Sequence, residues 1–526
     1  MTTATGIGEI LSVLMFVVVI SALMMGYPVV FTLAGVGFGF GLLGHFLGAF
    51  DLTYFNALPL RYWGILTNDV LIAVPLFIFM GVMLERSGIA EDLLRTLGEL
   101  FGRLRGGLAF AVILVGSLLA ASTGIVGATV TTMALISLPV MLASGYDKRV
   151  ASGLICATGT LAQIIPPSTV LVFLAVIMQT ANSQVQLAKG NYTPQTLSVG
   201  DLFAGAFIPG LMLSLLYTIW IIGLVIARPN SCPAMVSERS PGLYRKVVVA
   251  LAPSLILIVA VLGSIIAGIA TPTEAAAVGA VGAILLTMVR LIGNALAKRF
   301  SATLVDRVLF WYWLGTVGGL ALLALTAGAL GMLTGAVVLA GCVLAFMVVS
   351  REVRAAFAKV LTEVTRQSLN LTVMVFVIFL GATVFSLVFT RLGGDAVVAA
   401  FLNNMPGGQH GAIAVVMGIV FILGMFLDTF EILFIVVPIS APILLAMDVD
   451  PIWLSIMLAV NLQTSYLTPP FGFSLFFLRG VAPPEVRTTD IYRGIIPFVA
   501  LQIVCLAVVW GFPTLATWLP HVLYRH

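Results

Sequence analysis

Two pairs of adjacent prolines stand inside long apolar runs, with small hydroxyl residues around each pair. The pairs are Pro166-Pro167 and Pro469-Pro470. Proline removes a backbone N–H and disrupts a helix, so each pair leaves carbonyl oxygens without helical partners. A bare carbonyl in lipid is prohibitively costly, so such a break must line a cavity or meet another group. A sodium ion is one such group, because hard cations take oxygen ligands.

The candidate site residues form two clusters, each joining one proline pair to a second interrupted apolar stretch. The first cluster contains Ser122, Thr123, Gly124, Thr160, Pro166, Pro167 and Ser168. The second cluster contains Gly424, Asp428, Thr464, Ser465, Thr468, Pro469 and Pro470. We expect both clusters to bind sodium and substrate. The alternative is that the hydroxyl groups only join packed membrane helices by hydrogen bonds.

Asp428 is the most interesting ionisable residue expected at membrane depth, where charges are costly and usually functional. It is a candidate for direct contact with an ion or substrate, and the alternative is a helix cap that reaches water. Glu431 is a weaker candidate, because it can simply face the same aqueous cavity. By contrast, Thr271-Pro272-Thr273-Glu274 predicts a capping box at the start of a helix.

The sequence disfavours other chemistry. The four histidines form no metal-binding pair, the four cysteines are scattered, and no Walker A motif occurs. Gly39-Phe40-Gly41-Leu42-Leu43-Gly44 matches a dinucleotide fingerprint but lies inside an apolar run without a preceding strand. An intramembrane enzyme needs paired acids, a metal cluster or an activated nucleophile, and a channel needs a continuous polar pore. We expect neither, and we expect no cofactor beyond coupling sodium ions and no nucleic-acid partner.

Composition determines which elements must position these residues. Of the 526 residues, 61% are hydrophobic and only 9% are charged, whereas soluble domains have about 25% charged residues. The length therefore predicts many membrane spans of about 20 residues each. Hydropathy predicts crossings near 8–26, 28–50, 70–85, 150–182, 203–227, 247–269, 273–293, 308–329, 331–349, 368–390, 452–482 and 495–519.

Two further apolar stretches, 107–143 and 411–446, are too long for one span and are polar at their middle. We interpret each as a re-entrant hairpin. The segment 87–105 alternates charged and apolar residues at helical spacing, which is typical of a helix along the cytoplasmic interface or of a plain connecting arm.

The positive charges test this arrangement. With both hairpins treated as re-entrant, 21 of the 25 Lys and Arg residues fall on one side, and only Arg61, Lys189, Arg391 and Arg525 fall on the other. Positive residues accumulate on the cytoplasmic side. The scheme therefore predicts periplasmic termini, a first hairpin open to the cytoplasm and a second hairpin open to the outside.

The two halves also match in sequence. Pro139 and Pro442 lie 303 positions apart (442 minus 139), as do Asp147 and Asp450 and both members of the proline pairs. The same order of features with opposite flanking charge indicates an inverted-topology repeat, in which substrate and ion sites lie near the midplane at discontinuous helices. The predicted fold is an all-α polytopic membrane protein with inverted repeats, two re-entrant hairpins and two helices broken at Pro-Pro.

This reading divides the chain into five parts. Residues 1–105 form scaffold helices and an interfacial arm, 106–182 the first transport-core repeat, and 183–410 further scaffold helices, including extra spans at 308–349. The second transport-core repeat covers 411–482, and a C-terminal span covers 483–526.

Several motifs cover most of the chain. They are Gly145-Tyr146-Asp147-Lys148-Arg149, Gly159-Thr160, Pro166-Pro167-Ser168, the run from Gly268 to Ala276, Gly424 to Asp428, and Leu467-Thr468-Pro469-Pro470-Phe471-Gly472. Together they resemble the large membrane subunit, of the DctM type, of tripartite ATP-independent periplasmic (TRAP) transporters. The chain departs from the family pattern between about Asn294 and Arg366. The resemblance implies a sodium-coupled importer of the bacterial inner membrane that works by an elevator motion. It also implies two partners, a small four-helix membrane subunit (DctQ type) and a periplasmic substrate-binding protein (DctP type).

The expected function is therefore that of the permease subunit of a sodium-coupled, binding-protein-dependent secondary importer. A small organic anion such as a dicarboxylate, a 2-oxoacid, lactate or a sugar acid fits the resemblance. A stand-alone sodium/carboxylate symporter is the alternative, because the same inverted-repeat physics applies to it.

Overall fold

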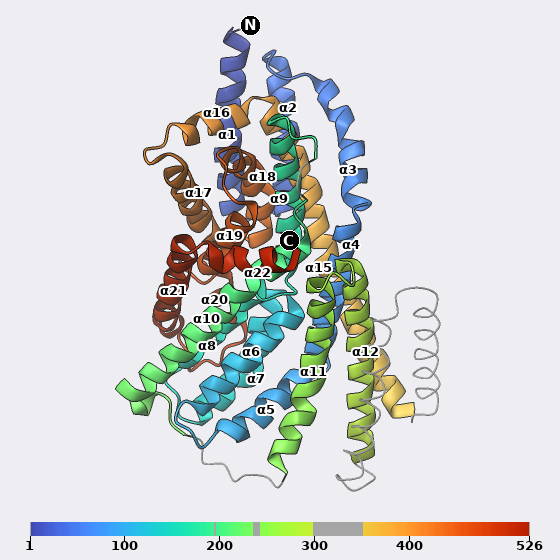
Figure 1. The fold of residues 1–526 in the computed structure, drawn as a ribbon, viewed down its shortest axis with the longest axis vertical. Helices are drawn as coiled ribbons and strands as arrows, with labels where there is room; N and C mark the ends of the chain where they lie inside the picture. Colours follow the sequence, from blue (N-terminus) through green and yellow to red (C-terminus); the bar gives the residue numbers. More distant parts are fainter. Residues whose placement is uncertain (1, 194–195, 235–241, 298–350, 525–526) are drawn as a thin grey trace.

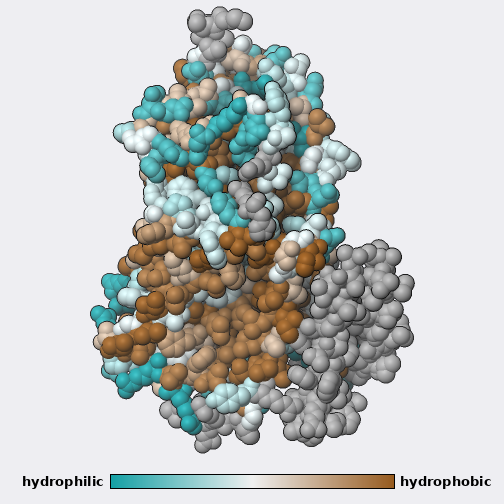
Figure 2. Space-filling view, viewed as in Figure 1, coloured by the Kyte–Doolittle hydropathy of each residue, from teal (hydrophilic) through white to brown (hydrophobic). Residues whose placement is uncertain are grey.

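The computed structural model of this protein describes residues 2–193, 196–234, 242–297 and 351–524 (Figure 1). All regular elements in these ranges are helices. Ten of them are long and apolar enough to cross a membrane, and Figure 2 shows a broad hydrophobic surface over the lower half of one face. The expected extra spans at 308–349 lie outside the described residues.

The N-terminal part begins with two apolar helices, α1 (Thr2–Met24) and α2 (Val29–Phe46), which match the first two expected spans. Two short helices that hydropathy did not predict follow, η1 (Leu52–Ala57) and α3 (Leu58–Leu66). The chain then bends by 55° into α4 (Asp69–Arg86). Asn68 sets this bend, because its side chain accepts hydrogen bonds from the amides of Val70 and Leu71 and caps α4.

The first repeat starts with the arm helix α5 (Ile89–Phe101). The hairpin predicted at 107–143 is confirmed as α6 (Gly107–Thr123) and α7 (Val126–Ala143), which pack on each other. The predicted broken span is also confirmed, because α8 (Lys148–Thr160) and a short 3-10 turn end before the proline pair and α9 (Thr169–Ala188) begins after it.

The second repeat has the same order of elements. It consists of α16 (Gly394–Asn403), the hairpin α17 (Gly408–Gly424) and α18 (Thr429–Ala446), and the broken span α19 (Pro451–Tyr466) and α20 (Phe473–Val481). Helices α6 and α17 begin and end 301 residues apart (408 minus 107, 424 minus 123), and α7 and α18 are 303 apart at both ends. The sequence repeat is therefore a structural repeat.

The two repeats enter the molecule from opposite ends. Figure 1 shows α6 and α7 in the lower half and α17 and α18 in the upper half. Their contacts are reciprocal: the second arm of the first hairpin, α7, packs on α20, and the second arm of the second hairpin, α18, packs on α9. The predicted fold class is thus confirmed.

The remaining helices surround this core. They are α10 (Val199–Ala227), α11 (Leu243–Ile266), α12 (Pro272–Ala297), α15 (Arg351–Arg391) and α21 (Thr488–Gly511). The predicted capping box is present at α12, where the Glu274 carboxylate accepts from the Thr271 amide at 2.8 Å.

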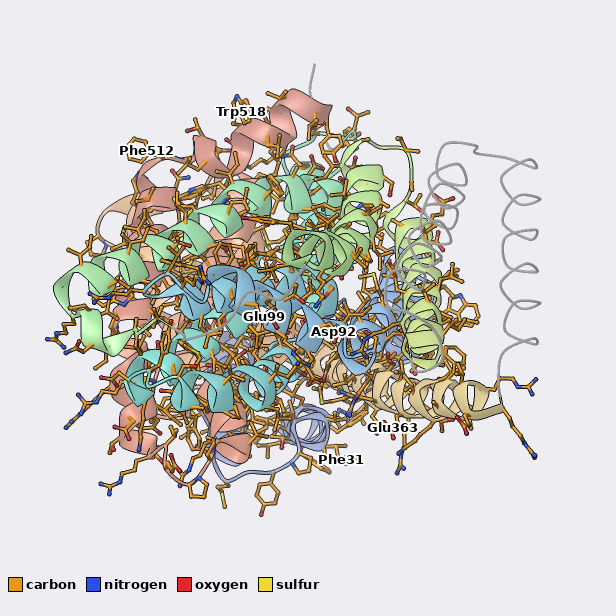
Figure 3. All side chains as sticks on the ribbon, turned by 90° about the horizontal axis from the view of Figure 1, so that it is seen from below. Phe31, Asp92, Glu99, Glu363, Phe512 and Trp518 are labelled. Atoms are coloured by element: carbon orange, nitrogen blue, oxygen red, sulfur yellow. The ribbon has the colours of Figure 1, made fainter. Side chains whose placement is uncertain are left out.

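The last predicted span is present as α21, which is long and apolar enough to cross a membrane, but its predicted bounds are wrong. The segment 495–519 is not a single helix, because α21 ends at Gly511 and a separate helix, α22 (Thr514–Tyr524), follows. Phe512 precedes Pro513 and has φ −128° and ψ 75°, outside the helical region, as the residue before proline prefers. Figure 3 shows Phe512 and Trp518 at one rim of the molecule and Phe31 at the other, and all three are well exposed.

Candidate functional site

The tip of the first hairpin is fixed to the first helix break. Gly124 ends α6 in a left-handed conformation with φ +60°, and its carbonyl oxygen accepts a hydrogen bond from the Thr169 hydroxyl at 2.8 Å. Ser122 and Thr123 are buried beside it, and the Thr123 and Thr129 hydroxyls lie 2.6 Å apart across the hairpin. Ser122, Thr123 and Gly124 therefore lie beside the start of α9, directly after the first proline pair.

The second hairpin is attached to the second break in the same way. The Gly472 amide donates to the Met425 carbonyl oxygen at 3.4 Å, and Gly424 contacts the Ser465 side chain closely. Asp428 caps α18, because its carboxylate accepts from the Thr429 amide at 2.7 Å. The cap expected as the alternative reading of Asp428 is thus present, and the Tyr466 hydroxyl faces the same carboxylate.

The predicted hydroxyl residues donate their hydrogens to backbone carbonyls, which leaves oxygen lone pairs for another partner. Five donate within their own helix, Thr468 donates from just beyond the end of α19, and Ser168 donates across the break to Gln163. The bonds run from Ser122 and Thr123 to Leu119, from Thr160 to Ala157, from Ser168 to Gln163, from Thr464 to Val460, from Ser465 to Leu462 and from Thr468 to Thr464.

Both breaks leave backbone oxygens without hydrogen bonds from the described residues. Both Pro-Pro peptide bonds are cis. Within the described part of the chain, no hydrogen bond reaches the carbonyl oxygens of residues 164–167, or those of Leu467, Thr468 and Pro469. The expectation that each proline pair leaves carbonyl oxygens without helical partners is thus confirmed, and their role as ion ligands stays a prediction.

Ser474, which the sequence analysis did not select, forms a hydrogen bond across the second break. The Ser168 hydroxyl donates to the Gln163 carbonyl oxygen at 2.8 Å, and the Ser474 hydroxyl donates to the Tyr466 carbonyl oxygen at 3.1 Å. Gln163 and Tyr466 are 303 apart and therefore equivalent. Three extra residues after the second proline pair move Ser474 out of that register, which hides its equivalence to Ser168 in the sequence.

Buried glutamines join the two repeats, and the sequence reading missed them as well. The Gln163 amide donates to the Thr429 hydroxyl at 2.9 Å, from the first break to the tip of the second hairpin. The Gln463 amide donates to the Thr160 hydroxyl at 3.3 Å, and these two residues occupy equivalent positions 303 apart. Gln502 bonds both Thr160 and the Tyr217 hydroxyl. The sequence did contain a signal for these residues, because a single glutamine in an apolar run is a polar group at membrane depth, and such groups are rare.

A cavity of about 320 Å³ lies where the hairpin tips face the surrounding helices. Residues from both tips, from both breaks and from α4 and α15 line it; the polar ones include Glu85, Arg86, Thr131, Gln163, Thr169, Gln367, Asp428, Thr429 and Tyr466. Of the predicted site residues, Gly124 and Asp428 line this cavity. The other predicted site residues are not among the residues that line it.

The charges of the cavity are unevenly distributed. Arg86 is the one basic group among the described lining residues, and two of its N–H groups donate to the Gln367 side chain. Glu85 accepts from the Thr132 hydroxyl at 2.8 Å, which connects α4 to α7. Asp428, at the start of α18, also lines the cavity. The described residues contain no cluster of three or more His, Cys, Asp or Glu side chains that suits a transition metal.

Comparisons with known proteins agree along most of the chain. The family described as "Tripartite ATP-independent periplasmic transporter, DctM component" matches residues 16–333 and 293–515. The C4-dicarboxylate TRAP transporter large permease protein DctM of Vibrio cholerae is 30% identical over 519 residues, which cover 97% of each chain. The isethionate TRAP transporter permease protein DctMQ of Oleidesulfovibrio alaskensis is 25% identical over 94% of this chain and 65% of its own length. The YdaH transporter of Alcanivorax borkumensis has a TM-score of 0.48 at 17% identity, covering 87% of this chain and 90% of its own.

Proposed function

Because this chain belongs to the family of the DctM component of tripartite ATP-independent periplasmic transporters, we propose that it couples the import of a small organic acid to sodium entry. Its relatives are large permease subunits of transporters rather than enzymes. The cavity supports the proposal most directly, because both hairpin tips and both helix breaks reach it. Such a convergence near discontinuous helices is where secondary transporters bind substrate and coupling ions.

Sodium binds, in this proposal, at the two predicted clusters. The bare carbonyls of the breaks and the lone pairs of Ser168, Thr464 and Thr468 supply neutral oxygen ligands, whereas the Thr160 oxygen already accepts from Gln463 and Gln502. The Asp428 carboxylate supplies charge at the second cluster. A sodium ion there also neutralises Asp428, which otherwise repels an anionic substrate in the same cavity. Binding of the ion and binding of the acid therefore favour each other.

The elevator motion carries the hairpins and broken helices past the scaffold helices α4 and α15. The arm helices α5 and α16 connect the two parts, and each is preceded by a left-handed glycine, Gly88 at φ +74° and Gly393 at φ +89°. Only glycine adopts this conformation without strain. The Glu85–Thr132 hydrogen bond joins the scaffold to the first hairpin and must break in each cycle.

A small four-helix membrane subunit and a periplasmic binding protein complete the transporter in the bacterial inner membrane. Family membership supports this assembly, and so does the fused name DctMQ of the isethionate relative, of which the present chain spans 65%. The substrates named for two relatives, C4-dicarboxylates and isethionate, support a carboxylate or sulfonate as the substrate class that we propose. The alternative is a stand-alone symporter that needs no binding protein.

Reconstitution into liposomes tests the proposal. The chain is reconstituted with its small subunit, the binding protein is added outside, and uptake of labelled succinate is followed with an inward sodium gradient. We expect uptake that requires both the gradient and the binding protein, and that stops when potassium replaces sodium. Equal uptake without the binding protein would favour the stand-alone symporter. Equal uptake without sodium, or a sustained ohmic current, would contradict the coupling.

A further inference from the structure

The side chain of Gln163 lines the cavity and is almost completely buried. The residue is 1% exposed and ends the short turn before the first proline pair. Its Nε2 donates to the Thr429 hydroxyl at 2.9 Å, but its Oε1 has no hydrogen-bond partner among the described residues. The Ser168 hydroxyl holds the Gln163 backbone in place through its carbonyl oxygen.

An unpartnered buried acceptor is costly, and native proteins keep one where it serves a purpose. The Thr429 hydroxyl can bond the side-chain amide of Gln163 in either of two orientations. A hydroxyl both donates and accepts, and no acceptor for the Thr429 hydroxyl hydrogen occurs among the described residues. If the amide rotates by half a turn, the Thr429 hydroxyl donates to Oε1. The NH₂ group then takes the place of Oε1 and offers its hydrogens to a bound anion.

We propose that Gln163 is a substrate-binding residue, whose amide donates hydrogen bonds to the carboxylate of the transported acid while Thr429 fixes the other end of the amide. This inference rests on the proposed function and assigns the anion-recognising group within it. The neighbouring cavity wall carries the acidic Asp428, and Arg86 lies on the scaffold helix α4. The Gln163 amide is a neutral donor on the moving core. It can therefore bind the carboxylate of the acid without forming an ion pair, which would slow the release of the acid.

Two other glutamines provide matched controls. Gln463 and Gln502 are equally buried, each also has an Oε1 without a partner among the described residues, and the amide nitrogen of each bonds Thr160. They differ from Gln163 in one respect, because neither is among the residues that line the cavity. If these glutamines only stabilise the fold, replacing any one of the three should have the same effect on succinate binding.

The test measures succinate binding to the purified chain with its small subunit, without the binding protein, by thermal stabilisation in sodium chloride. A ligand that binds only the native state raises the unfolding temperature, by an amount that grows with the logarithm of its concentration relative to its Kd. Gln163→Met keeps the length of the side chain and removes the amide. We expect it to raise the half-saturating succinate concentration roughly tenfold or more, as loss of a hydrogen bond to a charged group does. Gln463→Met should leave that concentration within about twofold of the wild type, because its amide does not reach the cavity.

Each outcome decides the assignment. Equal effects of Gln163→Met and Gln463→Met on succinate binding would overturn it, as would no effect of Gln163→Met. If Gln163→Met does not fold, Gln163→Asn, which retracts the amide by one methylene, must give the same rise. No stabilisation of the wild type by succinate, lactate or isethionate, while sodium-dependent uptake persists, would also overturn it. Absence of sodium-dependent uptake by the complete wild-type transporter would instead remove the proposed function.

Discussion

A close contact between the scaffold helix α4 and the transport core yields a prediction of definite size. Gly81 of α4 lies against the tip of the first hairpin, where a Cβ atom would stand 2.5 Å from the Thr123 Cα and 2.7 Å from the Thr123 carbonyl oxygen. Nonbonded carbon atoms need about 3.5 Å. Gly81→Ala therefore forces the hairpin tip and α4 apart by roughly 1 Å.

The energetic cost follows from this displacement. Adding one methyl group to a well-packed interface costs about 1–3 kcal/mol. At about 1.4 kcal/mol for each factor of ten, the conformation in which α4 touches the tip loses roughly 5-fold to 150-fold in population. Because the transport cycle must pass through this conformation, we expect the rate of uptake to fall within that range.

Succinate uptake into liposomes by Gly81→Ala and Gly39→Ala, at equal amounts of inserted protein, provides the measurement. Gly39 lies in the interior of α2, and a Cβ there would meet nothing within 4 Å. Both substitutions raise helix propensity by about 1 kcal/mol, so the control isolates the contact. The reasoning would be refuted if the two variants transported equally well.

Three further predictions concern the ion site, the breaks and the topology. Asp428→Asn should raise the sodium concentration for half-maximal uptake about tenfold and leave membrane insertion unchanged, which sodium titration of uptake and quantitative blotting will check. Ser168→Ala and Ser474→Ala should each lower the unfolding free energy by about 1 kcal/mol, the value of one hydrogen bond, and thermal unfolding should show no such loss for Ser144→Ala on the exposed end of α7. A phosphatase that is active only in the periplasm should be active when fused at the end of α18 and inactive when fused at the end of α7; the reverse result would invert the predicted topology.

The hairpins and the helix breaks could be predicted from the sequence because backbone N–H and C=O groups inside a membrane must be hydrogen-bonded or line a cavity. Long apolar stretches with Ser122-Thr123-Gly124 or Asp428-Thr429 at their middle cannot be single spans, and both became hairpins. The proline pairs interrupted helices where expected. The constant spacing between the halves then fixed the repeat, whose helices keep that spacing to the residue in α7 and α18.

The hydrogen bonds of the buried glutamines could not be predicted from hydropathy and residue spacing. Gln163, Gln463 and Gln502 come from three separate apolar helices or turns, and hydropathy averages over such single residues. Only the packing of α8, α19 and α21 brings two of these amides to Thr160. The end of α21 was missed for a related reason, since Gly511-Phe512-Pro513 interrupts the chain without lowering its mean hydropathy.

The two breaks occupy unequal environments, and this inequality predicts how they exchange. Ser168, directly after the first proline pair, is fully buried, whereas Phe471, directly after the second proline pair, is 56% exposed. In an inverted repeat, the conformation of one half becomes that of the other when access alternates between the two sides. With the four native cysteines replaced, Ser168→Cys should therefore react slowly with a maleimide under conditions that favour the present state, and Phe471→Cys should react rapidly. Shifting the transporter to its other state must raise the first rate and lower the second. If both rates changed in the same direction, the two breaks would move together with a loosening of the whole core, and an exchange between inverted halves would not be the basis of transport.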